Sequence, residues 1–167
     1  YLIGAVDGFA PYFQELVLPR LKKHLRPGGL LFIVGTEPIY ENYKGPGQQL
    51  IADVCRARDA CILLGGDRRR IYREFPLDWV MHQISLDSEW EVIGVGNFDI
   101  NYTERTLLRQ IGVGERKLAY VDNEELKRGL QSYLNELKSK VYETKWSGVK
   151  LGVDYVVGIK LKEKNKN

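Results

Sequence analysis

Cysteine is scarce in this sequence and stands only at Cys55 and Cys61. No histidine or cysteine partner lies at the spacing of metal ligands, so the sequence predicts no metal site. Two cysteines without such a framework indicate reduced thiols. This favours a reducing compartment over a secreted protein held together by disulfides.

Long apolar runs and strong charge are also missing. No run approaches the roughly 20 residues needed to span a bilayer, and no secretory leader precedes the first element. Lysine and arginine number 25 against 22 for aspartate and glutamate, a formal net charge of +3. Because this charge is small and both signs are interspersed, a nucleic-acid partner is not expected. The sequence therefore predicts a soluble, cytoplasmic protein without a membrane partner.

What is present fits one globular domain over residues 1–167. The chain is 44% hydrophobic and 28% charged, which is enough apolar material for a buried core. It opens at Tyr1 inside the apolar run YLIGAV, which resembles a buried strand. An unanchored terminal strand usually frays, so we expect the chain to be the carboxyl-terminal portion of a longer domain.

Strands and helices are predicted to alternate along the chain. Apolar residues at spacings of three and four predict helices at residues 11–26, 50–64, 76–87 and 126–141, the first of them interrupted by Pro19. Apolar runs predict strands at residues 1–6, 30–35, 90–100 and 154–162. This alternation favours an α/β fold with a doubly wound, mostly parallel sheet.

Two carboxylates follow predicted strands in the chain. Glu37 comes just after the strand at residues 30–35, and Asp7 comes directly after the strand at residues 1–6. Ligands of such folds lie beyond the carboxyl ends of the strands, so both side chains are candidates for a functional site. The alternative for each is a loop carboxylate that caps a helix or a turn.

The segment LPRLKKHLRPGGLLFIVGTEP, residues 18–38, resembles a helix, a Pro-Gly-Gly turn and the fifth strand of class I S-adenosylmethionine-dependent methyltransferases. The opening YLIGAVDGFAPYF is similar to the fourth strand of that family and the loop behind it. PLDWVMHQISLDSEWEVIGVG resembles the next helix and the sixth strand. DYVVGIKLKEK resembles the final strand, which in the family lies antiparallel between the fifth and sixth. Residues 107–122 are left over as an insertion.

The resemblance implies methyl transfer from S-adenosylmethionine, with this chain supplying mainly the substrate side of the site. It places Asp7, Gly8 and Phe9 at the cofactor and Tyr12 at the substrate. Glu37 would orient the nucleophile or accept its proton. The order Asp7-Gly8-Phe9-Ala10 differs from the motif of enzymes that methylate amines of nucleic-acid bases, which argues against that activity.

The glycine-rich cofactor loop of the family is absent from this chain. GVGE, residues 112–115, is no substitute, because it follows no strand, and we predict a loop there. The remaining substrate candidates are Tyr40, after the strand at residues 30–35, and the basic stretch GDRRRIYREF. In that stretch Arg70, Tyr72 and Arg73 could clamp an anionic substrate. The alternative is a solvated surface loop.

Two other classes of protein remain open. A non-catalytic methyltransferase-like module would bind another subunit instead of turning over a substrate. A nicotinamide-dependent dehydrogenase would share the sheet, but its glycine fingerprint is equally absent. For the enzyme we expect a small-molecule or protein substrate, and a homo-oligomer formed through the exposed edge of the first strand.

Overall fold

The computed structural model of this chain describes residues 1–39, 42–65 and 73–163. These residues divide into two compact units. Unit 1 takes its described residues from Tyr1–Pro38, Tyr72–Asp99 and Gly152–Asn167. Unit 2 takes its described residues from Ile39–Ile71 and Ile100–Leu151. Whether they act as one domain stays a prediction.

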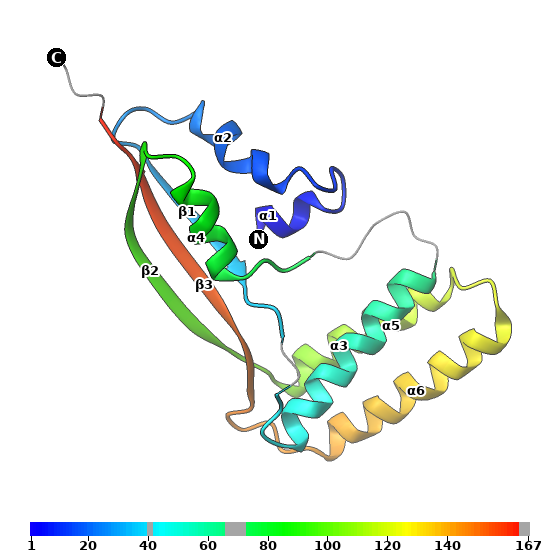
Figure 1. The fold of residues 1–167 in the computed structure, drawn as a ribbon. Coiled ribbons are helices and arrows are strands. Elements are labelled where there is room, and N and C mark those ends of the chain that lie inside the picture. Colours follow the sequence, from blue (N-terminus) through cyan, green and yellow to red (C-terminus); the bar gives the residue numbers. More distant parts are fainter. Residues whose placement is uncertain (40–41, 66–72, 164–167) are drawn as a thin grey trace. The chain divides into compact units, whose positions relative to one another are not determined.

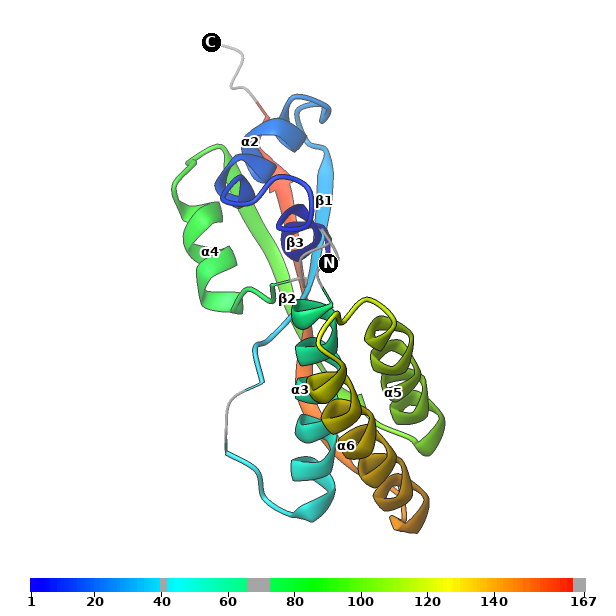
Figure 2. The same ribbon diagram turned by 90° about the vertical axis from the view of Figure 1, so that its right-hand side faces the viewer.

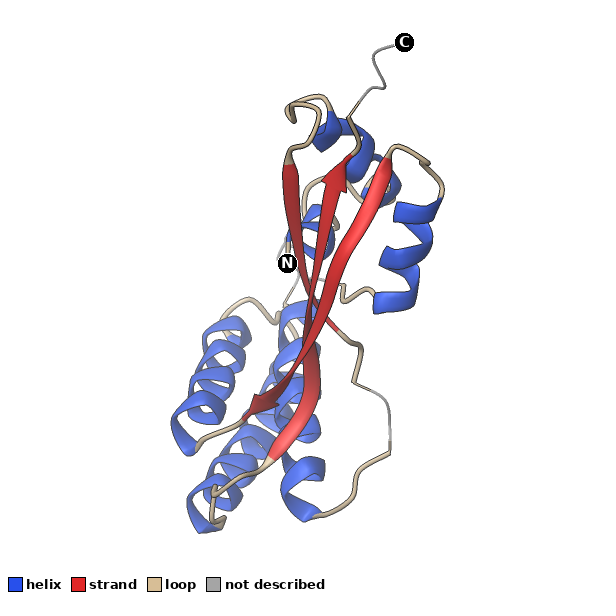
Figure 3. Cartoon of the chain, turned by 90° about the vertical axis from the view of Figure 1, so that its left-hand side faces the viewer, coloured by secondary structure: helices blue, strands red, loops and turns tan. Residues whose placement is uncertain are grey.

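Unit 1 is built on a sheet of three strands in the order β1-β3-β2 (Figure 1). The strands are β1 (Leu30–Thr36), β2 (Trp90–Asn101) and β3 (Lys150–Leu161). β1 pairs antiparallel with β3, from Leu30 opposite Lys160 to Thr36 opposite Asp154. All neighbouring strands run in opposite directions (Figure 3).

The prediction of a doubly wound, mostly parallel sheet is therefore wrong. It assumed that strands joined through helices become parallel neighbours. β1 and β2 do run in the same direction, but β3 occupies the place between them and opposes both. That central, antiparallel place of the last strand is the one that the methyltransferase resemblance implied.

One face of this sheet carries the core of unit 1. Helices α1 (Leu2–Val6), α2 (Val17–Lys22) and α4 (Leu77–Ser85) lie on that face, behind the strands in Figure 3. Alternate residues of the strands, among them Ile33, Val157 and Ile159, pack against these helices. On the opposite face, Phe32 and Ile93 stay exposed.

The first element is the clearest departure from the expected secondary structure. Residues 1–6 were predicted as a strand, but Leu2–Val6 form α1. Ile3 and Val6 are buried at helical spacing, and Gly4 backs onto the Arg73 carbonyl so closely that a Cβ would lie 2.4 Å from that oxygen. A six-residue apolar run cannot distinguish a strand from a buried helix by its pattern alone, which explains the error.

The segment predicted as an interrupted helix at residues 11–26 contains two short helices, η1 (Gln14–Leu16) and α2. Pro19 lies in the first turn of α2, where a missing N–H is tolerated. The turn before β1 uses Gly28 in the left-handed region with φ +78°, which suits a residue without a Cβ. The predicted strand at residues 30–35 is confirmed as β1.

Unit 2 is a helical bundle of α3 (Pro46–Leu64), α5 (Glu104–Leu118) and α6 (Glu124–Glu143). Each helix contacts the other two (Figure 2). Fully buried aliphatic side chains form its core, including Val54, Ile111 and Leu134. The predicted helices at residues 50–64 and 126–141 are confirmed as parts of α3 and α6.

Residues 107–122, left over as an insertion, largely form α5. The predicted loop at Gly112–Glu115 is wrong, because this segment lies inside that helix. Leu107, Ile111 and Leu118 are buried at helical spacing, and a Cβ at Gly114 would lie 3.4 Å from Leu134 of α6. Glycine here allows close approach of two helices. Across residues 1–39, 42–65 and 73–163, no helix has the length and apolarity to cross a membrane.

Candidate functional site

The candidate site of unit 1 lies at the carboxyl end of β1. Thr36 ends that strand, and its hydroxyl donates a hydrogen bond of 2.6 Å to Oδ1 of Asp154, its partner in register. The Tyr1 hydroxyl donates to Oδ2 of the same carboxylate at 2.9 Å. This bond to Asp154 raises the pKa of the Tyr1 phenol, because it stabilises the protonated form. A small cavity of about 30 Å³ adjoins these groups.

Glu37 follows this strand as predicted and has a structural partner. Its backbone N–H donates to the Val153 carbonyl at 2.8 Å, and its Oε1 accepts a 2.8 Å hydrogen bond from the backbone N–H of Leu77. Leu77 is the first residue of α4, so the carboxylate satisfies an N–H that the helix itself leaves unpaired. This capping role is the alternative that the sequence had left open.

Tyr155 is a site residue that the sequence analysis missed. Its hydroxyl donates to the Phe75 carbonyl at 2.7 Å, and only 1% of the residue is exposed. Burial, with a smaller contribution from the negative charge of Glu37, raises the pKa of Tyr155 to about 12. The ring crosses Gly35, where a Cβ would lie 2.3 Å from the Tyr155 hydroxyl oxygen. Only the strand register could have revealed this pair.

Asp7 is buried at the carboxyl end of α1 and is 5% exposed. Its Oδ1 accepts a 3.0 Å hydrogen bond from the side-chain amide of Gln14, and its Oδ2 lies 3.8 Å from Nε of Arg73. The structure thus brings together two predicted site residues, Asp7 and Arg73, as an ion pair. A buried carboxylate without partners would be costly, so Gln14 stabilises it with a hydrogen bond and Arg73 compensates its charge. Gln14 was also missed, and a polar residue within an apolar helical pattern was its only signal.

The loop after α1 presents aromatic side chains to solvent. Phe9 is 74% and Tyr12 is 79% exposed, while Gly8 is half-buried. Tyr12 has a φ of +70°, a left-handed conformation that costs a non-glycine residue about 1–3 kcal/mol. Next to it, the Arg20 guanidinium lies 5.7 Å from the centre of the Phe13 ring. Strain together with exposed aromatics is unusual for a purely structural loop.

Three of the predicted site residues, Tyr40, Arg70 and Tyr72, lie outside the described residues. The anion clamp proposed for Arg70, Tyr72 and Arg73 therefore stays a prediction. Arg73 itself faces Asp7, and its side chain is 59% exposed. Within the described part of the chain, no group of three or more His, Cys, Asp or Glu residues could hold a metal ion.

The chain matches none of the protein families to which it was compared, and no curated protein matches it. Any function must therefore be argued from the groups in place. These are a fixed carboxylate at Glu37, a hydroxyl and carboxylate cluster around Asp154, and the exposed aromatic residues Phe9 and Tyr12. Such a set can orient a polar acceptor and cover a planar or apolar group. It offers hydrogen-bond acceptors for a proton released by a nucleophile.

Proposed function

We propose that this chain supplies the substrate side of an S-adenosylmethionine-dependent methyltransferase. The supporting observation is that β3, the last strand, lies antiparallel between β1 and β2. In addition, a Pro-Gly-Gly turn leads into β1. Glu37 stands beyond the carboxyl end of β1, close to Thr36 and Asp154. The acceptor is a small molecule or a protein, and the proposed location is the cytoplasm.

The three residues assigned to the cofactor, Asp7, Gly8 and Phe9, differ in how freely they could contact a bound ligand. Phe9 is open to contact a bound ligand, whereas Gly8 is half-buried. Asp7 is engaged by the buried Gln14 and by Arg73, so direct binding would require it to give up these partners. We therefore assign Asp7 to holding the loop that carries Phe9, and Phe9 to the cofactor or acceptor. When bound, S-adenosylmethionine supplies an electrophilic methyl group.

Methyl transfer is an in-line displacement, and the chain's own residues would align the acceptor and remove its proton. Bound S-adenosylmethionine would supply the methyl group to the acceptor's lone pair and leave as a neutral thioether, so the chain's own residues would have to hold that lone pair in line with the methyl carbon. The acceptor then releases a proton. The Glu37 carboxylate is held by Leu77 and can accept that proton or a hydrogen bond that orients the acceptor.

Glu37→Gln in the complete protein tests this role. Glutamine keeps an oxygen for the Leu77 N–H and removes the charge, so we expect a melting temperature within a few degrees of the parent. General-base contributions are typically about 100-fold to 10,000-fold, so methyl transfer should fall at least about tenfold. The readout is transfer of labelled methyl to fractionated metabolites and proteins, beside calorimetric titration with S-adenosylmethionine.

Glu91→Gln is the matched control, because Glu91 is an exposed carboxylate on β2. It should leave both measurements unchanged. Full turnover by Glu37→Gln would reduce Glu37 to a capping residue, and loss of cofactor affinity would move it to the cofactor side. A complete protein that neither binds S-adenosylmethionine nor transfers methyl groups would refute the proposed activity.

The second candidate is a non-catalytic methyltransferase-like module that binds another subunit. It is favoured by the structural partners of both acidic residues, since Glu37 caps α4 and Asp7 pairs with Gln14 and Arg73. This candidate predicts no cofactor binding by the complete protein, together with a stable complex with a partner. The same calorimetric titration separates the two candidates.

Self-association through a sheet edge remains a proposal, but the edge strand involved is not the one that the sequence predicted. It was expected at residues 1–6, which form α1 and offer no strand edge. The outer strands of the observed sheet are β1 and β2. Unpaired backbone groups along outer strands can pair with a second chain. Sedimentation at two protein concentrations tests this, and a monomer at both would argue against it.

A further inference from the structure

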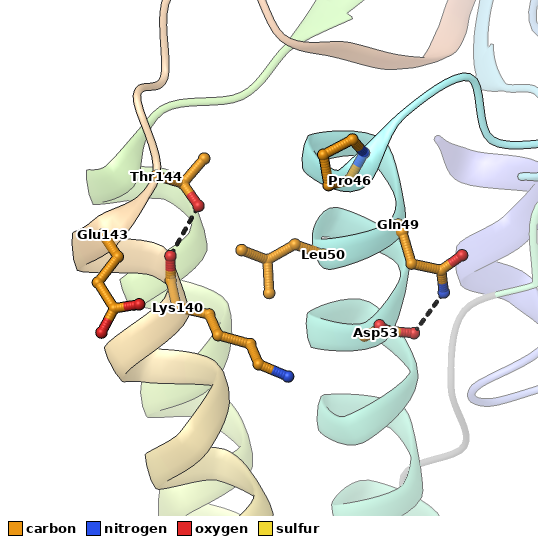
Figure 4. A pocket seen from close by; sticks show the side chains of 7 residues that line it. All are labelled: Pro46, Gln49, Leu50, Asp53, Lys140, Glu143 and Thr144. Carbon is orange, nitrogen blue, oxygen red and sulfur yellow. Dashed lines mark hydrogen bonds between the residues drawn. The ribbon is translucent and has the colours of Figure 1, made fainter.

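Unit 2 contains a second cavity, of about 310 Å³, between the start of α3 and the end of α6 (Figure 4). It contains none of the residues predicted for methyl transfer. The lining residues are Pro46, Gln49, Leu50 and Asp53 from α3, and Lys140, Glu143 and Thr144 from the end of α6. Pockets for small ligands usually begin at about 300 Å³, so the cavity suits a short molecule.

The floor of the cavity is apolar. The Leu50 side chain points from α3 toward α6, and Pro46 lies one turn before it (Figure 4). Leu50 is 7% exposed and belongs to the core of unit 2, which fixes its position. These carbon atoms can cover a few methylene groups of a ligand. They offer such a ligand no polar partner.

The polar groups around this floor mainly accept hydrogen bonds. The Gln49 amide donates to Oδ1 of Asp53 at 2.8 Å, which turns its donor side toward that carboxylate. The Thr144 hydroxyl donates to the Lys140 carbonyl at 2.7 Å, so its lone pairs are left to accept. The carboxylates of Asp53 and Glu143 are acceptors when ionised.

Among the described residues that line the cavity, Lys140 is the one cation, and its charge is already compensated. Its ammonium donates to Oε1 of Glu136 at 2.6 Å, and this bond raises the pKa of Lys140. Arg56 lies 3.8 Å from Asp53. Glu136 thus pairs with Lys140 and Asp53 with Arg56, and Glu143 adds a third carboxylate at the rim, so an excess of negative charge remains.

The ends of the two helices do not reverse this balance. The carboxyl end of α6, a helix of 20 residues, carries the negative end of its dipole and lies at the cavity. The start of α3, a helix of 19 residues, carries the positive end of its dipole to the same cavity, so the two helix ends largely offset each other, and its first residue, Pro46, has no N–H to offer an anion. The cavity therefore combines an apolar floor with surplus acceptors and surplus negative charge.

We propose that this cavity binds a small aliphatic primary amine as its ammonium ion. The alkyl chain would lie on Leu50 and Pro46. The ammonium group has three N–H donors, which match the acceptors of Asp53, Gln49 and Thr144. Glu143, whose side chain turns outward in Figure 4, adds negative charge at the rim.

Three probes of equal chain length test the charge requirement on the full chain. We expect n-pentylamine to bind saturably in a calorimetric or NMR titration. n-Pentanol lacks the charge and pentanoate carries the opposite one, so both should bind at least about tenfold more weakly. Pentanoate binding as tightly as the amine, or an amine that does not bind at tens of millimolar, would overturn the proposal.

Two variants test the residues. Asp53→Asn removes the charge and keeps the shape, and should weaken amine binding at least about tenfold, since hydrogen bonds to charged groups are the stronger ones. Glu143→Gln should weaken it about two- to threefold, because rim charges are screened. Glu125→Gln, at the other end of α6, is the matched control and should change nothing. Amine binding unchanged in Asp53→Asn, with a melting curve like that of the parent, would exclude this site.

Discussion

Units 1 and 2 differ in how closely they follow the usual preferences for helix caps, apolar cores and backbone conformation. In unit 2, α3, α5 and α6 bury aliphatic side chains, and the starts of α5 and α6 are capped by Thr103 and Asn123. Among the described residues, both buried polar side chains, Asp7 and Gln14, belong to unit 1, and so does the left-handed Tyr12. Departures from local rules concentrate at functional or strained sites, which favours unit 1 over unit 2 as the place of the proposed methyl transfer.

Replacing a glycine by alanine should have opposite effects in the two units. A Cβ at Gly35 would lie 2.3 Å from Oη and 2.4 Å from Cζ of Tyr155, whose ring is buried and hydrogen-bonded. We expect Gly35→Ala to lower the free energy of unfolding by about 1–3 kcal/mol, the typical cost of overpacking. A Cβ at Gly129 in α6 would meet nothing within 4 Å, so Gly129→Ala should stabilise by about 0.5–1 kcal/mol.

Urea unfolding of both variants measures this contrast. Gly94→Ala is the strand control, because a Cβ at Gly94 in β2 would likewise have open space around it. Equal stability of Gly35→Ala and Gly94→Ala would show that the contact between Gly35 and Tyr155 is not needed.

The buried phenol of Tyr155 should make unit 1 sensitive to alkali. Tyr155→Phe loses the bond to the Phe75 carbonyl, and we expect it to lower the free energy of unfolding by about 0.5–1.5 kcal/mol at neutral pH. The pKa of Tyr155 is raised to about 12 in the folded state, whereas a tyrosine in an unfolded chain titrates near 10. Between about pH 10 and 12 the unfolded state therefore releases this proton first, and the parent loses stability.

Tyr155→Phe has no phenol to ionise, so the difference in the free energy of unfolding between this variant and its parent should narrow between about pH 10 and 12. Denaturant unfolding of both proteins at several pH values measures this difference. Tyr142→Phe, at an exposed position on α6 of unit 2, is the control and should match the parent throughout. A constant difference between Tyr155→Phe and its parent up to pH 12 would contradict the assignment.

Replacing an exposed tyrosine by glycine should change stability in different directions in the two units. Tyr12→Gly relieves a left-handed strain of about 1–3 kcal/mol, against about 0.5–1 kcal/mol lost to the flexibility of glycine. We expect unchanged or slightly higher stability. Tyr120 in unit 2 has no left-handed backbone and lies 5.6 Å from the Lys117 ammonium, so Tyr120→Gly should destabilise. Thermal melting of both variants measures these effects. A Tyr12→Gly variant with a lower melting temperature than Tyr120→Gly would show that the backbone of Tyr12 is not strained.

The smallest effect is expected at a half-buried ion pair of unit 1. Lys22 donates to Asp87 at 2.6 Å and also to Glu89. The bond from Lys22, followed by one from the Glu89 backbone N–H, holds the pKa of Asp87 below its ordinary value of 3.8. A lowered carboxyl pKa stabilises the fold above the ordinary pKa, and this contribution is lost as the pH falls through the lowered value. Asp87→Asn should melt slightly below the parent at pH 7, and the gap should close below about pH 4.

The sequence predicted those elements whose pattern was long enough to be unambiguous. Leu50, Val54, Ala57 and Cys61 repeat over about three turns and are buried as expected, whereas Leu64, the last residue of the predicted face of α3, is 49% exposed. Short apolar runs were ambiguous: LLFIVG at residues 30–35 forms β1, whereas most of YLIGAV, a run of the same length, forms α1. The conformation of the opening run depends on the distant Arg73 carbonyl against Gly4, which no local pattern contains.

The candidate site was predictable only in part, for a related reason. Glu37 could be placed after a strand, but its hydrogen bond to Leu77 joins residues 40 positions apart in the chain. The pairing of Asp7 with Arg73 spans a similar gap, and Tyr155 lies opposite Gly35 through the strand register. Residue type and position suggest which groups could act. Their partners follow from tertiary contacts, which single-sequence patterns do not encode.

The central place of β3 also sets an order of assembly during synthesis. β3 is translated after β1 and β2, yet it lies between them, and its residues 154–160 pair with all of β1. A nascent chain that has emerged only as far as α6 therefore has both outer strands and no ladder to join them. The helices α3, α5 and α6 all precede β3 in the chain. Unit 2 can therefore form its core before β3 is available to complete the sheet. During that interval Ile33 of β1 and Trp90 of β2, which are buried in the folded protein, lie on unpaired strands, and this is when the chain would depend most on a chaperone.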